Sequence, residues 1–190
     1  MNYLAHLFLS HDSPDSMLGN LLGDLVKGNV QGKFPQEVVK GIMNHRIVDA
    51  FTDSNEVVSA SRKLISRSRY RYSGVIIDVV YDFFLSRNWG LYSSDDLDEF
   101  IEKVYMNLSS HNVRIPQNAR RFIDKMISED WLRSYGTTEG IDETFKRMSK
   151  RMTRENNLDT AVEELQVHYS SLKDHFLRFF PQLLTYLQRG

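Results

Sequence analysis

Imidazole and carboxylate side chains recur at intervals of four residues in two stretches of this chain. The stretch GIMNHRIVDAFTD contains His45, Asp49 and Asp53, and the stretch GVIIDVVYDFFL contains Asp78 and Asp82. On a helix, residues four apart lie on one face, about 40° from each other. Nitrogen and oxygen ligands on one face can bind a divalent metal ion, which activates water for hydrolysis. The spacing therefore predicts a metal site built from at least two helices.

The second stretch is the stronger indication, because its two acids interrupt a segment that is otherwise apolar nearly all the way round. Such a helix is expected to be buried. Two carboxylates on one face of a buried helix repel each other and lose hydration, so they stay ionised only beside a compensating positive group. A metal ion is the expected compensation for Asp78 and Asp82, with His45 as a nitrogen ligand.

Two further polar residues lie among apolar neighbours: His6 in YLAHLFL and Asp24 in NLLGDLVKG. Taken alone, His6 fits a hydrogen-bonded core histidine and Asp24 fits a solvated acid. The first stretch could likewise be the polar outer face of an amphipathic helix. Together, however, these separate segments each carry an acid or imidazole that can face one interior. Arg46 and Arg87 lie close by in the sequence and could stabilise charge on a phosphoryl group.

The amino-acid composition limits the kinds of functional site that this chain can form. The chain has no cysteine, so a metal must be held by histidine nitrogen and carboxylate oxygen, which favours Mn, Mg or Fe over structural zinc. There is no glycine-rich phosphate loop and no GxSxG nucleophile motif. The net charge of -1 gives no overall attraction to nucleic acid or membrane. No apolar run is long enough to span a bilayer, and MNYLAHLFLSHD lacks the basic flank of a signal peptide, so we expect a cytoplasmic protein.

The apolar periodicity predicts an all-α protein, a single domain over residues 1–190 with roughly eight helices. The chain is expected to begin helices after Pro14, Pro35 and Pro116. The expected helices cover about 14–28, 35–53, 55–67, 74–89, a segment from 95, 116–131, 141–152 and 158–187. The aromatic residues near the C-terminus are expected to form core.

Basic residues form two local clusters, and each is either a solvated face or a docking surface for an acidic partner or a phosphate. The first contains Arg62, Lys63, Arg67, Arg69 and Arg71. The second contains Lys146, Arg147, Lys150, Arg151 and Arg154.

Five segments, taken in order, resemble the bacterial acyl carrier protein phosphodiesterases, also called ACP hydrolases. They are MNYLAHLFLSH, GNLLGDLVKGN, HRIVDAFTDS, DVVYDFFLSRNW and HYSSLKDHFLRFFPQL. The resemblance implies an all-α fold related to the HD-type metal phosphohydrolases. It implies hydrolysis of the phosphodiester between 4'-phosphopantetheine and a serine of holo acyl carrier protein, with Mn²⁺ as the expected cofactor and Mg²⁺ or Fe²⁺ as alternatives. Phe8, Met43, Phe83 and Asn88 depart from the family pattern, standing where members carry histidine.

The expected roles divide the site residues into three groups. Metal binding is expected of His6, Asp24, His45 and Asp78. Proton transfer and charge stabilisation are expected of Asp49, Asp53, Asp82, Arg46 and Arg87. Docking of the acidic carrier is expected of the first basic cluster, Arg62 to Arg71. Two alternatives stay open: an HD-like hydrolase of a nucleotide or other small phosphodiester, and a noncatalytic helical binding protein. The oligomeric state is left open.

Overall fold

The computed structural model describes residues 1–154 and 156–188, and within these ranges the chain forms ten α-helices and no strand. The all-α prediction is confirmed. The helices of the first half are α1 (Tyr3–Phe8), α2 (Pro14–Leu22), α3 (Gln36–Ser54), α4 (Glu56–Leu64) and α5 (Ser73–Arg87). Those of the second half are α6 (Leu97–Ser109), α7 (Gln117–Ser128), α8 (Trp131–Ser134), α9 (Thr138–Arg151) and α10 (Val162–Gln188). Three short 3-10 helices cover Tyr70–Tyr72, Trp89–Leu91 and Leu158–Thr160.

Local capping residues set several helix boundaries near the expected positions. Pro14 opens α2, and the Ser13 hydroxyl accepts a hydrogen bond from the Ser16 backbone N–H at 3.2 Å. Asn55 separates α3 from α4, because its side-chain oxygen accepts from the Val57 N–H at 2.9 Å and so begins a new helix. The two short helices α1 and α8 were not expected from the sequence, because one or two turns are too few to show a helical period.

Two glycines allow α2 and α3 to cross with their backbones in contact. A Cβ atom on Gly19 would lie 2.3 Å from the carbonyl oxygen of Val38, and one on Gly41 would lie 2.5 Å from that of Ser16. Any side chain at either position would push the helices apart. This close crossing brings the end of α2 and the turn that follows it against the middle of α3, where the candidate site lies.

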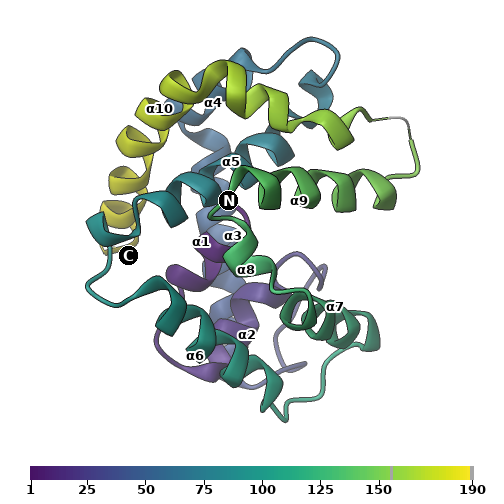
Figure 1. Ribbon diagram of the computed structural model, residues 1–190. Helices are drawn as coiled ribbons and strands as arrows, with labels where there is room; N and C mark the ends of the chain where they lie inside the picture. Colours follow the sequence, from purple (N-terminus) through teal and green to yellow (C-terminus); the bar gives the residue numbers. More distant parts are fainter. Residues whose placement is uncertain (155, 189–190) are drawn as a thin grey trace.

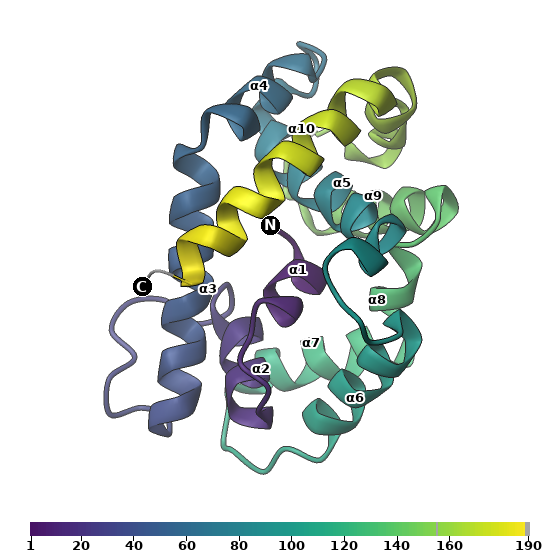
Figure 2. The same ribbon diagram turned by 90° about the vertical axis from the view of Figure 1, so that its left-hand side faces the viewer.

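The buried helix α5 packs against the long helix α10, which also lies across α3 and α4 (Figure 2). Tyr81 and Phe84 of α5 meet the ring of Phe176 at centroid distances of 5.6 and 6.0 Å. Phe176, Phe179 and Phe180 are all fully buried, so the aromatic C-terminal stretch is core, as expected.

The first residues of the chain lie inside the molecule. In Figures 1 and 2 the N-terminus is near the centre, surrounded by helices, and Met1 is buried. Helix α1 packs against both α2 and α5, so His6 is carried into the interior. None of the described helices is long and apolar enough to cross a membrane.

Candidate metal centre

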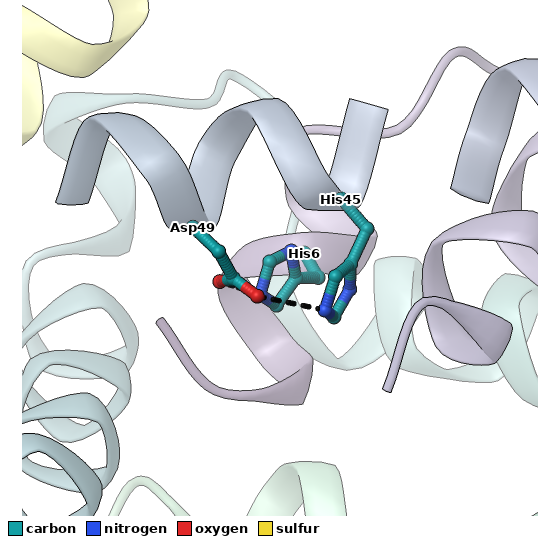
Figure 3. A group of neighbouring side chains, drawn as sticks. All are labelled: His6, His45 and Asp49. Carbon is teal, nitrogen blue, oxygen red and sulfur yellow. Dashed lines mark ion pairs between the residues drawn. The ribbon is translucent and has the colours of Figure 1, made fainter. Parts of the chain in front are cut away.

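Two histidines and one aspartate converge where α1 faces α3 (Figure 3). The Nε2 atom of His6 lies 3.1 Å from Oδ1 of Asp49, and the Nε2 atom of His45 lies 3.0 Å from Oδ2 of the same carboxylate. One ligand atom from each residue lies within 4.8 Å of the others. Both imidazoles are buried, whereas the Asp49 side chain is 37% exposed, so the group opens toward the surface on the Asp49 side.

The backbone and its neighbours fix the orientation of the His45 ring. Its Nδ1 lies 2.7 Å from the carbonyl oxygen of Asn20, and since a carbonyl only accepts, Nδ1 carries the proton. Nε2 then faces Asp49, and it is the nitrogen that would bind a metal ion once its own proton is released. Gly23 makes room for this ring, because a Cβ atom there would lie 2.2 Å from Cγ of His45.

The nitrogens of His6 supply the test of whether a metal fits. The His6 side chain is buried, and neither ring nitrogen has a hydrogen-bond partner among the described residues. Nε2 lies near Asp49 without the geometry of a hydrogen bond. A buried polar atom without a partner is costly, and a cation between two imidazoles and a carboxylate removes that cost. The donor set of nitrogen and carboxylate oxygen suits a divalent ion such as Mn²⁺ or Fe²⁺.

Asp24 and Asp78 lie beside this group, as the sequence predicted, and both line a pocket of about 330 Å³. Asp24 is in the turn after α2, with its Oδ1 3.3 Å from Nε2 of His45. The Asp78 carboxylate accepts a hydrogen bond from the α-amino group of Met1 at 3.0 Å, and that amino group lies 3.7 Å from Asp49. We call this cavity the site pocket; it lies beside the His6, His45 and Asp49 group, because Asp24 contacts His45 and the Met1 amino group contacts Asp49.

The electrostatic environment separates the two histidines. Burial lowers the pKa of both, but for His45 the carboxylates of Asp24 and Asp49 outweigh burial and raise the pKa to about 9. For His6 burial prevails, and its pKa falls to about 4. Burial also opposes ionisation of Asp49, yet the close approach of both imidazoles to its oxygens holds the pKa of Asp49 well below its usual value. Asp49 is therefore an anion between two rings, the charge state of a metal ligand.

Asp82 lies apart from this group and holds the start of α1. Its carboxylate accepts the backbone N–H groups of Asn2 at 3.3 Å, Leu4 at 2.7 Å and Ala5 at 3.3 Å. Complete burial raises the pKa of Asp82 to about 7, against the lowering effect of the Met1 ammonium and these donors. The compensation that the sequence assigned to a metal is supplied at Asp82 by three backbone donors.

Asp53 and the two arginines expected near the site also lie outside the convergent group. Asp53 is 68% exposed and forms an ion pair of 2.5 Å with Arg62. Arg46 donates to the carbonyl oxygen of Val26 at 3.0 Å, in the loop after Asp24. Arg87 is exposed and lines a different hollow, between Phe83 and the start of α9.

The first basic cluster is partly neutralised. Arg62 pairs with Asp53, and Arg69 pairs with Glu163 at 2.7 Å and with Glu164 at 2.9 Å. The other three cations of the cluster are exposed, and no acid among the described residues forms an ion pair with them. These are Lys63, Arg67 and Arg71. The cluster lies close to the site pocket, because Arg62 packs beside Gly74, next to the pocket-lining Val75.

The four positions where the resemblance led us to expect histidine have contacts of their own. Phe8 packs against Trp89 at a centroid distance of 5.1 Å, and Phe83 meets Phe84 edge-on at 5.3 Å. The Asn88 amide donates to the carbonyl oxygen of Phe84, and Met43 is 41% exposed on α3. None of these contacts involves the convergent group of His6, His45 and Asp49.

Three contributors to the site were not expected from the sequence: the Met1 amino group, the Asn20 carbonyl and Gly23. The signal for Asn20 was its position four residues before Asp24, although the group it contributes is a backbone oxygen. The signal for Gly23 was its place directly before Asp24, at the end of α2. Nothing in the sequence pattern indicated the contact between Met1 and Asp78.

The chain is similar over nearly its whole length to proteins of one family. The family model described as acyl carrier protein phosphodiesterase matches residues 1–183. A Klebsiella pneumoniae protein named acyl carrier protein phosphodiesterase is 35% identical over 188 residues, which cover 97% of this chain and 96% of that protein. The Yersinia pestis protein of the same name is 35% identical over 189 residues, covering 99% and 98%. No solved structure matches, so the relation to the HD-type hydrolases stays a prediction. The match of nearly the whole chain shows that it belongs to the acyl carrier protein phosphodiesterase family.

Proposed function

We propose that this protein is a metal-dependent phosphodiesterase that releases 4'-phosphopantetheine from the serine of holo acyl carrier protein. The observation that carries the proposal is the group of His6, His45 and Asp49 beside the site pocket, in a chain that matches this family over residues 1–183. The name of the relatives indicates the substrate class, and the two histidines with Asp49 indicate metal-assisted hydrolysis.

The proposed ligands of the metal are Nε2 of His6, Nε2 of His45 and the carboxylate of Asp49. Asp24 and Asp78 lie close enough to complete or support the site. Mn²⁺ is the proposed ion, with Mg²⁺ or Fe²⁺ as alternatives, because the chain offers nitrogen and oxygen donors and no thiolate. A bound divalent ion supplies Lewis-acid polarisation of a phosphoryl oxygen and lowers the pKa of water.

The chain's own residues position the reactants and move the proton. Asp24 and Asp78 are the two carboxylates on the wall of the site pocket, so we assign proton acceptance from the attacking water to this pair. Asp53 and Asp82, expected earlier among the proton acceptors, are occupied by Arg62 and by the start of α1. The hydrogen bond from Nδ1 of His45 to the Asn20 carbonyl keeps the ring in one orientation through the reaction.

Three exposed cations of the first basic cluster support a protein substrate. Lys63, Arg67 and Arg71 would attract an acidic carrier protein and increase its rate of encounter. Arg62 pairs with Asp53, and Arg69 pairs with Glu163 and Glu164. Both arginines therefore contribute less to docking than the sequence suggested.

Mass spectrometry of holo carrier protein after incubation with the Mn²⁺-loaded protein tests this function. The expected result is loss of the 4'-phosphopantetheine mass from the carrier and its appearance in solution. An intact carrier together with rapid hydrolysis of a nucleotide phosphodiester would favour a small-molecule hydrolase instead. Metal binding without turnover of either substrate would identify a noncatalytic binding protein.

A further inference from the structure

The C-terminal end of α9 forms one wall of the site pocket. Met148, Arg151 and Met152 line the cavity together with Asp24 and Asp78. Among the described residues that line it, Arg151 carries the one basic side chain. It belongs to the second basic cluster, which the proposed function does not use.

The charges on this wall leave a substrate phosphate in need of a cationic partner. A phosphodiester is an anion, and Asp24 and Asp78 place two carboxylates on this wall, of which Asp78 is paired with the Met1 ammonium. A metal bound by Asp49 and the histidines neutralises part of this charge. A guanidinium can neutralise more, since its planar fork matches two phosphate oxygens and binds them with two parallel hydrogen bonds.

Arg151 is held in place by an aromatic ring and not by an ion pair with an acid of the described residues. Its guanidinium carbon lies 5.0 Å from the centre of the Trp131 ring, and that of Arg147 lies 4.6 Å from the same ring. Trp131 is buried and is fixed by the hydrogen bond from its Nε1 to Glu129 at 2.8 Å. No carboxylate of the described residues pairs with Arg151, in contrast to Arg62 and Arg69.

Arg151 lies between the Trp131 ring and the site pocket. Besides the site pocket, it lines a small hollow together with Tyr3, Trp131 and Tyr135. It also lines a wider open depression of about 690 Å³ with Arg147 and Lys150. The Arg151 guanidinium can therefore contact a ligand that enters the site pocket from the α9 side.

We propose that Arg151 binds the phosphoryl group of the substrate, donating from its guanidinium to phosphate oxygens while the ester lies at the metal centre. Met148 and Met152, on the same wall, are placed to contact the apolar part of the pantetheine arm. This assignment rests on the proposed function for the identity of the phosphoester, whereas the interaction of Arg151 with phosphate can be measured independently.

Calorimetric titration of the Mn²⁺-loaded protein with 4'-phosphopantetheine, and with pantetheine that lacks the phosphate, tests the assignment. Arg151→Gln should weaken binding of 4'-phosphopantetheine by about tenfold to about a hundredfold, as expected for loss of hydrogen bonds to a charged group. It should leave pantetheine binding and metal content unchanged. Arg151→Lys should fall between Arg151→Gln and the unmodified protein, because lysine keeps the charge and loses the fork.

The matched control is Lys150→Gln, which removes the same charge from the neighbouring residue of α9, outside the site pocket. It should bind 4'-phosphopantetheine as the unmodified protein does. Equal affinities in Arg151→Gln and the unmodified protein, or equal losses in Arg151→Gln and Lys150→Gln, would overturn the assignment.

The outcome also separates this inference from the proposed function. If the unmodified protein leaves holo carrier protein intact while Arg151→Gln still loses phosphate affinity, the proposed function fails and the role of Arg151 stands. If the carrier is cleaved and Arg151→Gln changes neither the dissociation constant for 4'-phosphopantetheine nor the KM for the carrier, the role of Arg151 fails alone.

Discussion

The imidazole rings of His6 and His45 stack face to face, with their centroids 3.7 Å apart and 14° between their planes. Two charged rings in this arrangement would repel each other inside the protein. Burial, with a smaller contribution from the charge of His45, lowers the pKa of His6 to about 4, whereas Asp24 and Asp49 raise that of His45 to about 9. Both Nε2 atoms face the carboxylate of Asp49, so a divalent cation in their midst would replace the proton that His45 holds.

Replacing Asp49 by Asn should remove metal binding while the fold persists. The carboxylate is the one group in contact with both imidazoles, and an amide oxygen is a much weaker ligand for Mn²⁺. Loss of an outer partner of a ligand typically costs about 10- to 100-fold in metal affinity, and loss of Asp49 should cost at least as much. Metal analysis after dialysis against Mn²⁺, with circular dichroism for the fold, measures the effect.

Asp53→Asn is the control for that variant, because Asp53 lies four residues further along α3 and is 68% exposed beside Arg62. It should keep the metal content of the unmodified protein. Equal metal loss in the two variants would show that the site extends to Asp53 or that the assignment to Asp49 is wrong.

Gly23→Ala should weaken metal binding without any change in a ligand. The added Cβ atom would lie 2.2 Å from Cγ of His45, so the ring must move away from Asp49. We expect a loss of about 10- to 100-fold in metal affinity, the size typical of lost ligand orientation. Gly90→Ala is the matched control, because a Cβ atom at Gly90 meets nothing within 4 Å. Unchanged Mn²⁺ affinity in Gly23→Ala would contradict the positioning of His45 by this turn.

The helix carrying His45 and Asp49 could be predicted closely, because its polar residues repeat at a helical interval. The expected 35–53 corresponds to α3 at Gln36–Ser54. The same four-residue interval also predicted that Asp53 would face the site, which it does not. Two steps of four from His45 turn it about 80° around the helix. There, near the helix end, it meets the solvent and Arg62 instead of the interior.

Asp82 shows a second limit of sequence reasoning. The buried position of this acid was expected correctly from its apolar neighbours, but burial does not say which positive group compensates it. The compensating groups are backbone N–H donors of α1, a helix of six residues that leaves no periodic signal. The N-terminus of α1 contacts α5 only in the folded protein. Asn2 and Asp82 are 80 residues apart in the sequence, so local spacing does not predict their contact.

Glu164 should make stability depend on acid pH. Burial opposes its ionisation, but hydrogen bonds from Ser66 and Arg69 prevail and hold the pKa of Glu164 below its usual value. Since the folded-state pKa is lowered, this stabilisation is complete above the unfolded-state pKa, about 4.3, and is lost as the pH falls toward the folded-state pKa. Glu164→Gln should lower the free energy of unfolding near neutral pH by about 1–3 kcal/mol and reduce its fall below about pH 4.3.

Denaturant unfolding of both proteins between neutral and acid pH measures this effect. Glu163→Gln is the control, because Glu163 also pairs with Arg69 but is 58% exposed. An exposed pair contributes about 0–1 kcal/mol, so this variant should stay close to the unmodified protein. Parallel pH profiles for Glu164→Gln and the unmodified protein would refute the role of Glu164.

Reversing the charge of Lys63 and Arg67 together should slow the reaction with holo carrier protein and spare a small phosphodiester. The two side chains are exposed and lie away from the metal ligands, so hydrolysis of bis(p-nitrophenyl) phosphate should keep its kcat/KM. Attraction between exposed charges is screened over about 10 Å at 0.1 M salt. The kcat/KM for the carrier should therefore fall with salt in the unmodified protein and depend little on salt in the variant. Lys33→Glu with Arg121→Glu, an equal charge change at exposed positions on other elements, is the control. If the control pair slows the carrier reaction as much as Lys63→Glu with Arg67→Glu, net charge and not a docking face governs the encounter.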